Sequence, residues 1–186
     1  RLSGHATPDR TGSSMHVRPV LLRVIDQLDD CAAFVVSDLG VMLAQNQLSK
    51  LLQGERTGQT GVEASRPWHW FAPPEVRAVP IEDQPAASHL QVADLRATWS
   101  RRPNDPDVRE LIDALLVTGE EFTEIWERHE VGLRHPMTKR LIHPRVGVLE
   151  VDCETMATAE EGQSLVILGA APGTETTRSA SVWPPP

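Results

Sequence analysis

Residues 35–54, VVSDLGVMLAQNQLSKLLQG, hold the pattern that decides the fold. Two β-prone runs flank a short turn in which Gly40 can take the positive φ of a tight hairpin, so they are expected to pair as antiparallel strands. Asn46 then stands where a helix N-cap is preferred, and leucines follow at helical intervals until Gly54 ends the helix. The expected order is two strands, 33–37 and 41–44, an asparagine and a short helix.

Four further segments have the apolar spacing of amphipathic helices. Pro19 suits the first turn of the earliest one, and a Pro-Asn-Asp-Pro break at 103–106 separates the next two. In the last, Glu120 and Glu121 are favourably placed at the helix N-terminus. Helices are predicted over 17–30, 83–101, 107–117 and 120–129.

Beyond His129 the apolar period changes to two, which is typical of strands. In 146–153, Leu149, Val151 and Cys153 share one face, so that face is expected to be buried. Together with the first hairpin and the helices, this predicts an α+β domain with an antiparallel sheet of about five strands, covered by helices, and an N-terminal helix. The late strands are expected at 131–133, around Leu141, at 146–153 and at 165–169.

Composition limits the function classes. The chain has 186 residues, of which 40% are hydrophobic, enough for one domain with its own core. It has no run of 18 apolar residues and no signal-peptide pattern, so neither a membrane nor secretion is indicated. The net charge of −8 is opposite in sign to a nucleic-acid-binding surface. Cys31 and Cys153 form no metal, redox or disulfide pattern, which favours reduced thiols and a cytoplasmic protein.

The ends differ from the middle in composition. Residues 1–16 are rich in Gly, Ser, Thr and Pro and are expected to be a linker, and 175–186 a disordered tail. The chain begins at Arg1 rather than methionine, so we expect a part upstream to be missing. The folded domain is expected over 17–174.

The candidate catalytic and metal-binding residues do not match the spacings that such sites require. His129 and His135 are six positions apart, not the four of HExxH, so metal binding is not expected. Asp152 belongs to the water-facing side of its predicted strand, which argues against an acid–base pair with His143. No nucleotide or serine-nucleophile motif is present, and we expect no enzyme; a hydrolase that uses His143 with Asp152 is the least favoured alternative.

Five segments then carry a resemblance. They are RPWHWFAPPEVR (66–77), LRATWSRRPNDPDVRELIDALL (95–116), EEFTEIWERHEV (120–131), KRLIHPRVGVLEVDCETM (139–156) and LVILGAAPGT (165–174). Together they resemble the ligand-binding domain of MmyB-like transcription regulators, and the hairpin–Asn–helix entry resembles a PAS-like domain. The resemblance implies a PAS-like fold that binds a small apolar ligand such as a fatty acid. It also implies an N-terminal helix-turn-helix domain, absent here, that binds DNA.

The resemblance extends to single positions. Trp70 and Phe71 match the family's W-x-F-like aromatic position, and Phe122 and Trp126 match its E-F-x-x-x-W helix. The sequence departs from the family at Val79, where a tyrosine is common, and at Gly119, where a serine commonly precedes the E-F pair. The K-x-x-x-H-P-x-x-G hairpin is matched by Lys139, His143, Pro144 and Gly147.

The bulky side chains of the middle segments suit the wall of an apolar pocket, and the alternative is that they simply form the core. The cations Arg134, Lys139, Arg140 and Arg145 suit a carboxylate head group at the pocket mouth, and the alternative is a solvated strand face. The residues predicted to bind the ligand are Trp70, Phe71, Leu95, Trp99, Leu115, Phe122, Trp126, Arg134 and His143.

These inferences predict the sensory half of a bacterial transcription regulator. The expected partner is a long-chain apolar molecule such as a bound fatty acid, and no other cofactor is expected. DNA is contacted only through the missing domain, no membrane is involved, and a homodimer is possible. Binding would bias the first helix or a dimer contact. The alternative from another class is a protein-interaction or dimerisation module with a self-filled core.

Overall fold

The computed structural model describes residues 15–72, 76–129, 137–160 and 162–170. The helices are α1 Pro19–Asp26, α2 Gln47–Gln53, α3 Arg66–Phe71, α4 Gln84–Arg101, α5 Pro106–Leu116 and α6 Glu120–Glu127, with the 3-10 turns η1 Val62–Ala64 and η2 Ile81–Asp83. The strands are β1 Ala32–Ser37, β2 Met42–Gln45, β3 Thr138–His143, β4 Gly147–Ala157 and β5 Gln163–Gly169.

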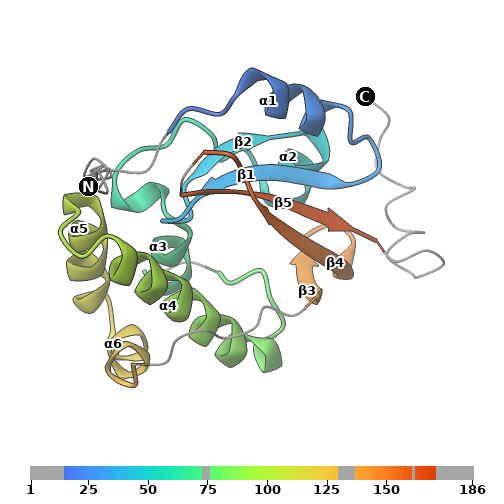
Figure 1. Cartoon of the computed structure of the whole chain (residues 1–186). Coiled ribbons are helices and arrows are strands. Elements are labelled where there is room, and N and C mark those ends of the chain that lie inside the picture. Colours follow the sequence, from blue (N-terminus) through green and yellow to red (C-terminus); the bar gives the residue numbers. More distant parts are fainter. Residues whose placement is uncertain (1–14, 73–75, 130–136, 161, 171–186) are drawn as a thin grey trace, which may run out of the picture.

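The strands form one antiparallel five-stranded sheet in the order β2-β1-β5-β4-β3. The last strand of the chain, β5, lies at its centre, between the first hairpin and the last one (Figure 1). The prediction of an α+β, PAS-like domain with a single antiparallel sheet is confirmed.

The two faces of the sheet are covered differently (Figure 1). On the outer face, Ile25 of α1 packs against Ala33 and Val35 of β1. The opposite face, which we call the inner face, is turned toward α2 and the α3–α6 layer. Its apolar side chains alternate with those of the outer face, as the period of two requires. They include Ala32, Phe34, Met42, Leu149, Val151, Val166 and Leu168.

The early hairpin and the asparagine after it are confirmed. Gly40 has a φ of +76°, the left-handed region that glycine adopts at low cost. The Asn46 side chain accepts a 2.9 Å hydrogen bond from the Ser49 amide and so caps α2. In β4, Leu149 and Val151 are buried and their neighbours exposed, as the alternating pattern predicted.

Other boundaries differ from those expected. The first helix was predicted to reach residue 30, but α1 ends at Asp26, because the Asn46 amide group binds the Leu28 carbonyl and turns the chain toward β1. Val24, an apolar residue of α1, is 47% exposed. Helix α3 was not predicted. The strand expected at 131–133 lies outside the described residues.

Candidate functional site

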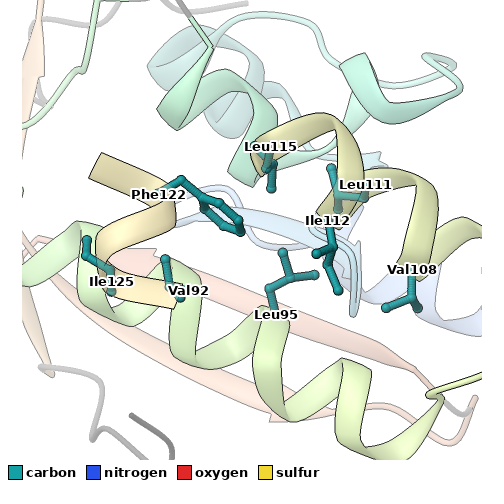
Figure 2. Close-up of a cluster of buried hydrophobic side chains, with 8 residues drawn as sticks. All are labelled: Val92, Leu95, Val108, Leu111, Ile112, Leu115, Phe122 and Ile125. Carbon is teal, nitrogen blue, oxygen red and sulfur yellow. The ribbon is translucent and has the colours of Figure 1, made fainter. Parts of the chain in front are cut away.

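Helices α3–α6 enclose an apolar core, shown in Figure 2 and called the helical cluster here. Leu95, Leu115 and Phe122 are each at most 1% exposed, so neighbouring side chains cover them on all sides. Three of the predicted ligand-binding residues are thus packed as core in this structure. The cluster consists of Val92, Leu95, Val108, Leu111, Ile112, Leu115, Phe122 and Ile125.

Four of the predicted aromatic residues form a chain of touching rings. Phe122 stacks on Trp126 with ring centroids 5.7 Å apart, and Phe71 meets Phe122 edge-on at 5.2 Å. Trp99 meets Trp126 edge-on at 6.1 Å between ring centroids and is 39% exposed. Because Phe71 and Trp126 are only partly buried, the margin of the helical cluster keeps accessible aromatic surface.

Trp70 is oriented by a polar network. Its indole N–H donates to Ser88 Oγ at 2.8 Å, and that hydroxyl donates to Glu121 Oε1 at 2.6 Å. The Arg77 guanidinium pairs with the same carboxylate and lies 4.8 Å from the centroid of the Trp70 ring. The hydrogen bond from Arg77 lowers the pKa of Glu121. These contacts fix the Trp70 side chain of α3 relative to α4, which carries Ser88, and α6, which carries Glu121.

The inner face of the sheet is apolar but less completely covered than the helical cluster. Val166 and Leu168, on the central strand, are buried. Leu141 and Cys153, on neighbouring strands, are only partly buried. Helices α4–α6 make their main contacts with one another and with α3, η1 and η2 rather than with a strand. The inner face and the helical cluster are therefore two separate apolar surfaces.

Polar contacts fasten the helical layer to the sheet at two ends. At the β1–β2 turn, Asp38 pairs with Arg102 at 2.7 Å, and its carbonyl accepts from Thr98 Oγ1 at 3.0 Å. At the β3 edge, Arg140 pairs with Asp83 at 2.7 Å. This fastening positions the helical layer opposite the inner face.

The remaining predicted residues lie elsewhere. His143 is 8% exposed at the end of β3, where its Nε2 lies 3.2 Å from the Leu51 carbonyl and its Nδ1 accepts from the Arg145 amide at 3.3 Å. These contacts belong to the α2 side of the sheet rather than to the ring chain. Arg134 lies outside the described residues. Arg140 is engaged by Asp83.

The structure separates the residues considered for catalysis. In the β3–β4 ladder His143 pairs with Gly147, whereas Asp152 pairs with Thr138, five residues away along β3. That separation corresponds to about 17 Å, and the two side chains point to opposite faces. Glu130 and His135 lie outside the described residues, and no group of three potential metal ligands occurs within the described ones.

A hollow of about 270 Å³ lies between the β1–β2 turn, η1 and α5. Leu39, Val62 and Leu111 contribute to its wall.

Among the described helices, none is long and apolar enough to cross a membrane.

The chain matches a known protein family. The model of a family described as MmyB-like transcription regulator ligand binding domain matches residues 17–181, most of the 186-residue chain. Comparison with curated proteins gives no match.

Proposed function

The chain belongs to the family of MmyB-like transcription regulator ligand-binding domains, and from this membership we propose that it binds a fatty acid or a similar long apolar molecule. The ligand lies between the inner face and the helical cluster. The observation that carries this proposal is the apolar surface that remains accessible at Leu141 and Cys153, which are only partly buried on the inner face. When the ligand covers such surface, each Å² of apolar area removed from water contributes roughly 25 cal/mol to the free energy of binding.

The predicted residues take different parts in this proposal. Trp70, Phe71 and Trp126 are partly buried and contact the ligand from the helical side. Leu95, Leu115 and Phe122 support that wall from behind, since they have almost no accessible surface. Trp99, Arg134 and His143 complete the proposed set.

In this proposal the domain regulates DNA binding by a helix-turn-helix domain elsewhere in a cytoplasmic regulator. A ligand does this only by favouring one arrangement over another, here of α1 or of a homodimer contact. On α1, Val20 is 49% and Val24 47% exposed, which supports a contact with a second copy. The same exposure favours the second candidate function, a protein-interaction module without a small ligand.

We expect the purified protein to carry a lipid, or the lipid-free protein to bind tetradecanoic acid. Mass spectrometry of a denatured extract identifies the lipid. Tetradecanoic acid at about 100 times its Kd is expected to add about 2.7 kcal/mol and so to raise Tm by roughly 5–10 °C. Butanoic acid at equal concentration is the control, because its chain covers little apolar surface. Absence of lipid from every preparation, with no change in Tm, would favour the interaction module.

A further inference from the structure

The hollow between the β1–β2 turn, η1 and α5, which we call the α5 hollow, has a volume of about 270 Å³. Its wall is mostly apolar and includes Leu39, Val62 and Leu111. Leu111 belongs to the helical cluster and the other two side chains pack against that cluster, so the wall is supported from behind. An apolar cavity of roughly 150 Å³ is enough to hold benzene. The α5 hollow therefore has room for an aromatic ring with a short side arm.

Polar contacts fix the walls of the α5 hollow relative to one another. Arg102 pairs with Asp38 of the β1–β2 turn at 2.7 Å and with Asp105, the N-cap of α5, at 2.8 Å. The Gly40 carbonyl accepts a 3.1 Å hydrogen bond from the backbone N–H of Arg66, the first residue of α3. The turn is thus joined both to α5 and to the helix that follows η1. The hollow is therefore already formed, as small-molecule sites usually are.

The rim of the α5 hollow is acidic. Asp107 and Glu110 line it, both are exposed, and their spacing of three places them on one side of α5. Within the described ranges, neither carboxylate has an ion pair or a hydrogen bond that neutralises it. No described residue that lines the hollow is basic, and Arg102 is already paired with two carboxylates. The rim therefore favours a positive group and disfavours a carboxylate.

We propose that the α5 hollow binds a small organic cation. The apolar group of this molecule lies against the wall that Leu111 supports, and its ammonium group faces the carboxylates of Asp107 and Glu110. The site is separate from the one proposed for the fatty acid, and its ligand has the opposite charge. The inference does not depend on the proposed function.

The bound cation also contacts the chain just before α1. Met15 lines the α5 hollow, and Val17 is buried in the apolar cluster that joins α1 to the outer face. The His16 carbonyl between them accepts a 3.0 Å hydrogen bond from Gln163 at the start of β5. A cation that binds one arrangement of this segment better than another shifts the balance between the two. The hollow thereby connects the start of α1 to the helical layer.

Titration of the isotope-labelled protein, followed by NMR, tests the proposal because it detects weak binding and locates it. The probes are 2-phenylethylammonium, neutral 2-phenylethanol and phenylacetate, which have similar apolar parts and different charges. The cation is expected to shift the amide signals of Leu39, Val62 and Leu111 with saturation. It is also expected to bind at least about fivefold more tightly than the alcohol, and phenylacetate less tightly than the alcohol. Raising the salt concentration reduces both differences.

Asp107→Asn combined with Glu110→Gln removes both rim charges and keeps the size of the side chains. The preference for the cation over the alcohol is expected to fall below about twofold, and the affinity for the alcohol to change by less than about twofold. The matched control combines Glu63→Gln with Asp113→Asn, at exposed carboxylates of η1 and α5 that do not line the hollow. This control is expected to keep the preference.

The proposal is supported if saturable shifts occur around the α5 hollow and only the Asp107→Asn, Glu110→Gln variant loses the preference for the cation. It is overturned if the cation produces no saturable shift there at about 10 mM, the weakest affinity expected for a molecule of this size. It is also overturned if the wild-type protein binds cation and alcohol equally well, or if the rim variant keeps the preference. Binding of tetradecanoic acid decides the proposed function separately.

Discussion

Replacing Phe122 by alanine is expected to lower the free energy of unfolding by about 3–5 kcal/mol, the usual cost of removing a fully buried aromatic ring. The ring is 1% exposed and contacts both Phe71 and Trp126. Its loss leaves a cavity that rigid neighbours on four helices fill only in part. Chemical denaturation followed by far-UV circular dichroism measures the change.

Val117→Ala is the matched control, because Val117 lies just after α5 and is 84% exposed. Its expected cost is under about 0.5 kcal/mol. A loss below about 1 kcal/mol for Phe122→Ala would contradict a filled helical cluster and would favour a ring that borders open space.

Asn46→Ala is expected to cost about 3 kcal/mol or more, because one side chain serves four backbone groups. Its Oδ1 accepts from the amides of Ala33 and Ser49, and its Nδ2 donates to the carbonyls of Leu28 and Cys31. Alanine leaves these groups unsatisfied where α1, β1 and α2 meet. Denaturant unfolding of the purified variant gives the change in free energy.

Asn46→Asp separates the two halves of this network. The carboxylate still accepts hydrogen bonds from the amides of Ala33 and Ser49 but cannot donate to the two carbonyls. The free energy of unfolding is therefore expected to lie between those of wild type and Asn46→Ala. A loss of only about 1 kcal/mol for Asn46→Ala would show that the asparagine does no more than cap α2, and Asn46→Asp would then be nearly as stable as wild type.

Local signals explain what the sequence predicted correctly. Gly40 and Asn46 act within a few residues of themselves, and the alternation around Leu149 and Val151 reflects burial of one face of a strand. Helix α3 was missed because 66–71 is too short to show a helical period, although Ser65 caps it and Pro67 stands in its first turn. Fold class was therefore predictable, but the short connecting helix was not.

The candidate site depends on contacts between distant parts of the chain. Leu95 and Trp99 were both predicted to bind the ligand, but the sequence does not reveal which neighbours cover a side chain, and Trp99 is 39% exposed whereas Leu95 is 1% exposed.

Alkylation of Cys153 tests most directly whether the ligand lies between the inner face and the helical cluster. Cys153 belongs to the inner-face cluster and is partly exposed, so it reports on that space in a Cys31→Ser variant. Tetradecanoic acid at about 100 times its Kd is expected to slow its reaction with iodoacetamide by about tenfold or more. Cys31, whose pKa is raised by burial and by Asp30, serves as the control in Cys153→Ser and reacts at an unchanged rate. An unchanged Cys153 rate in protein that calorimetry shows to be saturated would place the ligand elsewhere, for example in the hollow beside Leu39, and would contradict the proposed site.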